Sequence, residues 1–435
     1  MRRFPEIGIR ILATFLSCLA AGCGSDARNS QQPSGTTIAV SALARNTTPQ
    51  ISDTDLAAVV AGNTTFALKV FPLLDSVPND NVFFSPYSIT QAFALLAPGA
   101  RGTTLSEIEL ALSFPLSQDR LNPAFNKLDL QVTAEANGSF SNGIQAPQLN
   151  NANAVWGQQD FSILPAYLDT LAVNFGAGLH LVDFKNATET SRQTINGWVE
   201  GQTNKRIQNL IPADGVSTST RLVLTNAPWF KANWATPFPP LGTAAQAFIN
   251  RGGLSSSVPF MNQQLSLPYA QVDGCQAADI PYAGGNLSML VIMPTSGSFD
   301  SFASTLTPTL LGDITSHLSG KTIAFSLPKF SFTLAVPMGD ILKSLGMTVP
   351  FDSVLADFSG IDGKPDLFVG EIFHQAFVNV DEVGTEAAAA TAISVTTATV
   401  VSPPDLTLTI DHPFIFLIRD RQTGLILFMG KVVSL

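Results

Sequence analysis

The 435-residue sequence has little charge and few of the residues that most often carry catalysis. Only 13% of its residues are charged, and it contains three cysteines and four histidines. The chain has no HExxH or CxxC pair, no G-x-S-x-G elbow and no phosphate-binding glycine loop. These absences argue against the common metalloenzymes, serine hydrolases and nucleotide-binding enzymes. We expect neither a metal nor a cofactor.

Runs of basic residues are lacking too. Asp and Glu number 33 against 23 Lys and Arg, which gives a net charge of −10. The longest basic run after residue 22 is Lys205-Arg206. A nucleic-acid partner would require a concentrated basic patch. The sequence therefore predicts that the protein does not bind nucleic acid.

The N-terminus is typical of an exported lipoprotein. Arginines precede an apolar run at residues 11–19, and the Ala-Ala-Gly-Cys string ending at Cys23 resembles a bacterial lipobox. We expect residues 1–22 to be a signal peptide, Cys23 to carry lipid, and residues 23–53 to form a flexible tether. An ordinary cleaved leader and a retained membrane anchor are the alternatives. The prediction is a protein secreted across the inner membrane and anchored by lipid in the bacterial envelope, at the outer membrane or cell surface.

The expected leader also determines which cysteines remain in the folded protein. Cys18 would leave with it and Cys23 would carry lipid, so Cys275 would have no disulfide partner. We expect Cys275 to be a buried apolar residue, with a reactive thiol as the alternative. At 45% hydrophobic residues and 30 Phe, the chain has ample material for a core.

The most informative stretch covers residues 380–401, VDEVGTEAAAATAISVTTATVV. The fourteen residues after Gly384 contain no Pro, no Gly and a single charge, Glu386, so a strand could form there. Such a strand would point Thr385 toward a core and Glu386 toward water. Its alanine-rich part prefers helix, so an exposed helix or a flexible linker is the alternative.

Other segments predict individual elements. A helix is expected from Thr54 with an interruption at Gly62, a strand and two helices from Asn81, and an amphipathic helix over residues 195–211. Residues 131–150 have little pattern and predict a loop or a short helix. A long central strand is expected over residues 222–234, and a hairpin around Gln422-Thr423-Gly424.

Four segments together resemble the serpins. They are the string GTEAAAATA from Gly384, DHPFIFLIRD from Asp411, the opening NVFFSPYSITQAF from Asn81 and LVLTNAPWFKANW from Leu222. The resemblance covers residues 54–435 and implies one α+β domain. In that fold a large, mostly antiparallel central sheet is accompanied by further sheets, about eight to nine helices and an exposed reactive loop at about residues 384–405. Pro228 departs from the family pattern, because proline is costly inside a central strand.

The resemblance also implies roles for single residues. The scissile bond, fourteen positions after Gly384, would join Ala398 and Thr399, with Thr397, Thr399 and Val400 as neighbouring candidates for the residue before the cut. Trp234 would lie at the top of the main sheet. A polar cluster beneath the middle of that sheet would contain Ser85, Ser88, Asn226 and His374. The hinge of the loop would comprise Gly384, Thr385, Glu386, Ala387, Ala388, Ala389, Ala390 and Thr391.

The resemblance implies a protease inhibitor, not an enzyme. A serine protease, or a cysteine protease as a second class, would attack the loop, form a covalent acyl complex and be displaced as the loop inserts as a strand. A small residue at Ala398 suits elastase-like or subtilisin-like proteases, because the pocket carboxylate of a trypsin-like one would stay unpaired. We expect a monomer.

Two other functions remain open from the sequence. A non-inhibitory serpin-fold binding protein or chaperone is the first, although the small residues of the hinge argue against it. An envelope hydrolase is the second, although the sequence lacks its catalytic constellation.

Overall fold

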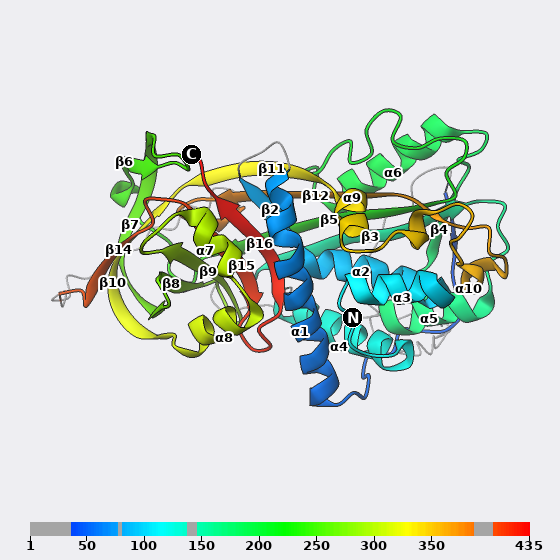
Figure 1. The fold of residues 1–435 in the computed structure, drawn as a ribbon, viewed down its shortest axis with the longest axis horizontal. Coiled ribbons are helices and arrows are strands. Elements are labelled where there is room, and N and C mark those ends of the chain that lie inside the picture. The colour runs from blue at the N-terminus through cyan, green and yellow to red at the C-terminus, as the bar shows by residue number, and fades with distance from the viewer. Residues whose placement is uncertain (1–35, 77–80, 137–145, 387–402) are drawn as a thin grey trace, which may run out of the picture. The chain divides into compact units, whose positions relative to one another are not determined.

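The computed structural model describes residues 36–76, 81–136, 146–386 and 403–435. Cys23, the hinge residues from Ala387 to Thr391, and the bond between Ala398 and Thr399 lie outside these residues. Within them, the chain forms two large sheets and ten α-helices (Figure 1). The expected α+β fold with large, mostly antiparallel sheets is confirmed, with ten described α-helices where about eight to nine were expected.

The first sheet is mostly antiparallel and has seven described strands. Only β3 and β4, and β5 and β12, run parallel to each other. Its order is β1 (Thr37–Ala39), β4 (Leu179–Val182), β3 (Gln148–Gln158), β5 (Leu222–Asn233), β13 (Gly384–Thr385), β12 (Val369–Val380) and β11 (Phe330–Pro337).

The second sheet has nine described strands and contains the predicted C-terminal hairpin. Gly424, at φ 79°, turns the chain between β15 and β16. The strands are β14 (Leu406–Thr409), β10 (Ser319–Pro328), β7 (Ser255–Val272), β8 (Cys275–Pro281), β9 (Leu287–Pro294), β15 (Phe414–Asp420), β16 (Ile426–Val432) and β2 (Val82–Phe84), with β6 (Ala244–Ile249) paired to β7.

Helices cover both faces of the first sheet, and α7 and α8 lie beside the second sheet. Figure 1 shows α6 on one face and α2 on the other. In the described residues they are α1 (Asp53–Val70), α2 (Pro86–Leu96), α3 (Gly102–Ala111), α4 (Gln118–Ala136), α5 (Pro165–Phe175), α6 (Thr188–Gln202), α7 (Phe299–Thr305), α8 (Pro308–Ser316), α9 (Met338–Ser344) and α10 (Ser359–Asp362).

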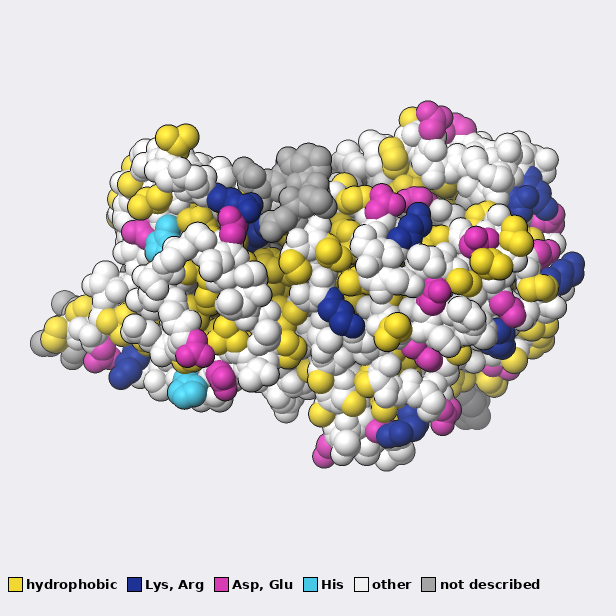
Figure 2. All heavy atoms as spheres, viewed as in Figure 1, with side chains coloured by type: hydrophobic (Ala, Val, Ile, Leu, Met, Phe, Trp, Pro, Cys, Tyr) yellow, Lys and Arg dark blue, Asp and Glu magenta, His cyan; other side chains and the backbone are white. Residues whose placement is uncertain are grey.

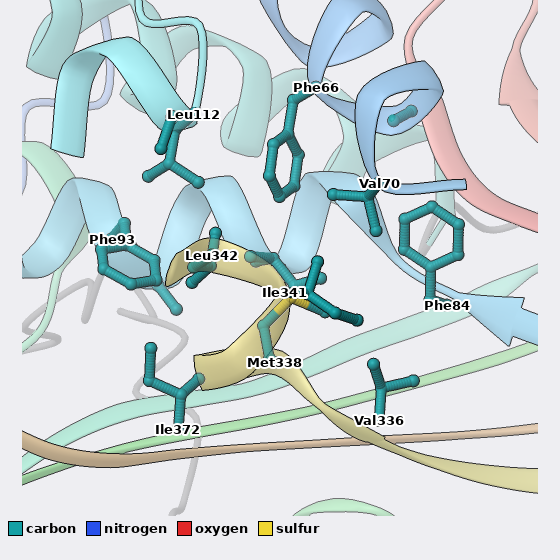
Figure 3. Close-up of a cluster of buried hydrophobic side chains, with 14 of the residues drawn as sticks. Phe66, Val70, Phe84, Phe93, Leu112, Val336, Met338, Ile341, Leu342 and Ile372 are labelled. Atoms are coloured by element: carbon teal, nitrogen blue, oxygen red, sulfur yellow. The ribbon is translucent and has the colours of Figure 1, made fainter. Parts of the chain in front are cut away.

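Side chains of β5 alternate between the two faces of the first sheet, so this strand contributes to the core on both sides. Leu222 and Leu224 enter the core beneath α2, while Val223, between them, packs with Ile195 of α6. Figure 3 shows part of the larger core, where Met338 and Leu342 of α9 lie between α2 and the sheet. Helix and sheet are therefore joined by burial on both sides of β5.

The predicted break in the first helix is wrong. α1 runs without interruption from Asp53 to Val70, capped by the Ser52 hydroxyl, which accepts from the Asp55 N–H. Gly62 serves a close approach instead, because a Cβ there would lie 2.4 Å from the Ser113 carbonyl oxygen. By length and composition, 53–74 could cross a membrane, but Phe66 and Val70 are buried in the core.

The prediction of a loop or a short helix over residues 131–150 is wrong at both ends. Helix α4 continues to Ala136 and β3 begins at Gln148. The reason is visible in burial, since Leu128, Val132 and Ala136 continue one buried stripe at helical spacing. The polar residues between them are only partly buried and do not end the helix.

The predicted helix over residues 195–211 ends early. Helix α6 ends at Gln202, and Asn204 and Lys205, which follow it, have positive φ. A right-handed helix cannot continue through residues in this conformation.

Part of the expected tether packs on the domain. Strand β1 pairs with β4 at the edge of the first sheet, Thr37 opposite Leu181. Further along, Arg45 forms an ion pair with Asp129 of α4 at 2.7 Å. The prediction of a flexible tether is therefore wrong for residues 36–52. This segment pairs with the edge strand β4 and forms an ion pair with a carboxylate of α4.

Charged side chains are scattered over the surface, and the cysteine of the folded domain is buried. On the face shown in Figure 2, acidic and basic side chains are scattered without a patch of one sign. Among the described residues, no group of acidic, His and Cys side chains could hold a metal ion. Cys275 is buried and free, and burial raises the pKa of its thiol to about 11. A reactive thiol is therefore not supported.

Candidate functional site

Strands β5 and β12 are joined along only part of their length. Their parallel pairing ends where Asn226 lies opposite His374. At the other end of β5, Ala232 and Asn233 pair with β13. Between these points, residues 227–231 of β5 have β3 as their sole strand neighbour in the described part of the chain. We call the gap between residues 227–231 of β5 and 375–379 of β12 the seam.

The seam explains why proline is tolerated in this central strand. Pro228 lies opposite Asn151 of β3 and has no strand partner on the seam side among the residues that the structure describes. A proline cannot donate to a ladder, so it is expected where a strand has an open edge. Pro228 therefore occupies a locally unpaired edge inside the sheet.

The four residues of the expected polar cluster lie together where the pairing of β5 with β12 ends. The Ser85 hydroxyl caps α2 by accepting from the Ser88 N–H at 3.0 Å, and the Asn226 amide donates to the Ser88 hydroxyl at 2.8 Å. His374 Nδ1 bonds to the Asn226 side-chain oxygen, and His374 Nε2 accepts from the Ser85 N–H at 3.4 Å. The cluster therefore connects helix α2 with both strands that border the seam.

These contacts fix the state of the histidine. Nδ1 must carry the proton, because its partner on Asn226 is a carbonyl oxygen, and Nε2 must be an acceptor. His374 is buried, and burial lowers its pKa to about 3. A neutral, fully hydrogen-bonded imidazole is suited to joining two strands and poorly suited to serving as a general base.

The hinge enters the sheet at the far end of the seam. Gly384 and Thr385 form β13, which lies between β5 and β12: Gly384 is opposite Asn233, and Thr385 is opposite both Ala232 and Val380. Gly384 is required for space, because a Cβ there would lie 1.9 Å from the Ala232 carbonyl oxygen. The first residues of the loop thus already occupy the position of an additional strand.

Thr385 is the side chain that this strand buries. It is 1% exposed, and its hydroxyl lies 2.6 Å from the hydroxyl of Tyr282. Tyr282 in turn stacks on Trp234 with ring centroids 4.8 Å apart. Thr385 therefore points inward, as predicted, and its hydroxyl contacts Tyr282.

Trp234 closes the end of β5 beneath the turn that precedes the hinge. Its indole N–H donates to the Asp381 carbonyl at 2.9 Å, and its backbone N–H donates to the Val383 carbonyl at 2.8 Å. Lys329 and Glu382 form an ion pair at 2.7 Å on the same turn. Together these contacts hold the segment before Gly384 in one place.

Glu386 differs from the expectation that it would face water. Its side chain is 3% exposed and forms an ion pair with Arg206. Burial raises the pKa of its carboxyl to about 7, although Arg206 acts in the opposite direction. The cost of removing the carboxylate from water therefore has a larger effect on its pKa than the attraction to Arg206.

Three contributors to the site were not found from the sequence. Asn153 of β3 accepts from Asn226 at 2.7 Å and donates to the Ser88 carbonyl at 3.0 Å. Tyr282 and Arg206 contact the hinge as described above. Each comes from a segment far from its partner in the chain, so no local spacing could have indicated it. The hinge residues from Ala387 and the bond after Ala398 lie outside the described residues.

Comparisons with known proteins agree with this architecture. The sequence profile of the serpin (serine protease inhibitor) family matches residues 61–435. An uncharacterized serpin-like protein of Thermococcus kodakarensis is 37% identical over 357 residues, which cover 82% of this chain and 81% of that protein. Leukocyte elastase inhibitor A of Mus musculus is 34% identical over 384 residues, which cover 86% of this chain and 98% of that protein.

A solved structure shares the fold. The crystal structure of tengpin, a thermophilic serpin in the native state, has a TM-score of 0.77 and 28% sequence identity, and the match covers 90% of this chain and 98% of that one. The family profile, the relatives and the arrangement of hinge, seam and sheet all lead to one assignment. This chain belongs to the serpin family.

Proposed function

We propose that this serpin inhibits serine proteases by trapping them. The protease attacks the loop at the bond between Ala398 and Thr399, and the serine oxygen forms an ester with the Ala398 carbonyl while Thr399 leaves as a new amino terminus. The freed loop then enters the seam as a strand. A strand of fourteen residues at ~3.3 Å each spans roughly 46 Å, so the attached protease is displaced before water completes hydrolysis.

The observation that carries this proposal is the position of β13. Gly384 and Thr385 already pair with β5 on one side, and Thr385 pairs with β12 on the other. Ahead of them lies the seam, where residues 227–231 have no strand partner on the β12 side in the described structure. A strand that continues from Thr385 would complete these ladders, and strand addition to an open edge is a known source of affinity and stability.

The target class follows from the residue before the cut. Ala398 is small and apolar, so it suits elastase-like and subtilisin-like serine proteases. The similarity to a leukocyte elastase inhibitor supports the same choice. Cysteine proteases, which also form acyl intermediates, are a second target class.

The proposed site of action is the bacterial cell envelope. A leader over residues 1–22 and a lipid on Cys23 would hold the monomer at the outer membrane or cell surface, with residues 24–35 as tether. Mass analysis of the mature N-terminus checks this proposal. A lipid-modified chain beginning at Cys23 supports it, and any other N-terminus contradicts it.

The inhibitory function is tested by mixing the protein with an elastase-like protease and separating the products on a denaturing gel. We expect a band at the summed mass that survives denaturant, and a released peptide whose mass shows that it begins at Thr399. Cleavage without that band would contradict trapping and favour a substrate-like serpin. A matched run with a subtilisin-like protease shows whether the choice of target explains a negative result.

A further inference from the structure

A single glutamine of α2 holds β3 directly behind the seam. Gln91 is 8% exposed, and its side-chain oxygen accepts from the amides of Asn151 and Asn153 of β3, both at 3.1 Å. Asn151 lies opposite Pro228 of β5. Asn153 lies opposite Asn226, the last residue of β5 that pairs with β12. The glutamine therefore joins α2 to β3 at the point where β5 and β12 begin to separate.

The direction of the Gln91 amide is set by Asp129 of α4. Gln91 Nε2 donates to one carboxylate oxygen of Asp129 at 2.9 Å, and Arg45 donates to the other at 2.7 Å. The ion pair of Arg45 with Asp129 is mostly buried. A carboxylate accepts hydrogen bonds and cannot donate one. It therefore turns the nitrogen of Gln91 toward itself and the oxygen toward the asparagines of β3.

The same hydrogen bonds continue to the polar cluster. Asn153 donates to Gln91 and accepts from Asn226 at 2.7 Å. Asn226 in turn bonds to His374 of β12. An unbroken series of hydrogen bonds therefore runs from Arg45, in the N-terminal segment, to both strands that border the seam.

The bonds from Gln91 to β3 cross the surface along which the sheet must slide when it opens. Where Asn226 pairs with His374, a strand can enter only if β5 and β12 part by about one strand spacing, ~4.8 Å. β3 is paired with β5 along residues 222–231, so these two strands move together. Helix α2 stays with the other side, because the Ser85 hydroxyl at its start donates to a backbone carbonyl of β16 at 2.6 Å.

We propose that Gln91, with Asp129 and Arg45 behind it, forms a brake on the opening of the seam. The three are positioning residues that hold β3 and β5 against parting from β12. This inference rests on the proposed trapping function and specifies what resists the entry of the strand. The brake stabilises the intact protein relative to the inserted form, because its bonds to β3 exist only before β3 slides across α2.

The test uses a fluorescein-labelled synthetic peptide with the sequence of residues 387–398, AAAATAISVTTA, added to the intact protein. Its rate of binding, followed by fluorescence anisotropy, reports how readily the seam accepts a strand without any protease. Gln91→Met keeps the bulk of the side chain and removes both bonds to β3. We expect it to bind the peptide roughly fivefold to tenfold faster than the wild type, the change in rate that one lost hydrogen bond can produce. Arg45→Met should bind roughly twofold to threefold faster, because Asp129 still accepts from Gln91.

An exchange of donor and acceptor tests the series of bonds itself. In Asp129→Asn the new amide keeps its oxygen toward Arg45 and faces Gln91 with its nitrogen, so two donors meet and binding should be as fast as in Gln91→Met. Adding Gln91→Glu supplies a carboxylate that accepts from this amide and from the asparagines of β3. The double variant should therefore bind within about twofold of the wild-type rate. A side chain that contributed only packing would not be restored by this exchange.

The matched control is Asp160→Asn, which removes an exposed ion pair with Lys185 and should leave the rate unchanged. Equal or slower binding by Gln91→Met would overturn the brake, and so would a double variant that binds as fast as Asp129→Asn. The trapping of elastase on a denaturing gel would stand in either case. No binding of the peptide to any of these proteins would contradict the entry of a strand into the seam, and with it the proposed function.

Discussion

Replacing Thr385 by arginine should convert the inhibitor into a substrate. The Thr385 side chain is 1% exposed and lies against Tyr282, so an arginine there would have to be buried without a counter-charge or remain outside the sheet. An unpaired buried charge costs several kcal/mol. We expect insertion to slow so far that water resolves the acyl complex first, and the denaturant-resistant band to fall by at least about tenfold.

The matched control for that variant is Thr385→Ser, which keeps the hydroxyl opposite Tyr282 and loses one methyl group. It should trap protease nearly as well as the wild type. Cleavage at the same bond in both variants, read from the mass of the released peptide, shows that recognition of the loop is unchanged. If Thr385→Arg traps protease as efficiently as Thr385→Ser, entry of this residue into the sheet is not needed for inhibition.

Removing the imidazole of His374 should destabilise the intact protein strongly. His374→Ala leaves the Asn226 side-chain oxygen and the Ser85 N–H without their partner, at about 1–3 kcal/mol each, and adds a buried cavity. We expect a loss of about 4 kcal/mol in the free energy of unfolding. For a domain of this size the unfolding temperature should fall by roughly 5 °C or more.

Two comparisons isolate the role of the cluster. His317→Ala removes an exposed histidine and should change the unfolding temperature little. In the loop-cleaved protein an inserted strand would separate Asn226 from His374, so His374→Ala should cost much less there than in the intact protein. Equal losses in both forms would mean that His374 supports general packing and does not clamp β5 to β12.

The elements of this protein could be predicted where local pattern decides them. The hairpin around Gly424 and the strand 222–234 both appear as expected, because their apolar runs and turn residues sit next to each other in the chain. The helix break predicted at Gly62 does not occur. A glycine inside a helix can instead allow a close contact, and here Gly62 lies against the backbone of Ser113. Only the packed structure distinguishes these two uses.

The sequence indicated some residues of the site but not the contacts that connect them. Ser85, Ser88, Asn226 and His374 follow from resemblance, yet the ladder that ends at His374 and the role of Asn153 depend on strand register. The burial of Glu386 could not be foreseen either, because its partner Arg206 lies 180 positions away in a loop. Alternation along a strand predicts which face of the sheet a side chain points to. It does not predict which distant side chain will contact it there.

Hydrogen exchange along β5 and β12 tests the central claim most directly. The claim is that the seam between residues 227–231 and 375–379 is open in the intact protein and is filled by the reactive loop after cleavage. Amides that face the seam should exchange readily in the intact protein and become strongly protected once the loop is cut. Exchange in these two segments that is the same before and after cleavage would contradict loop insertion and the proposed trapping mechanism.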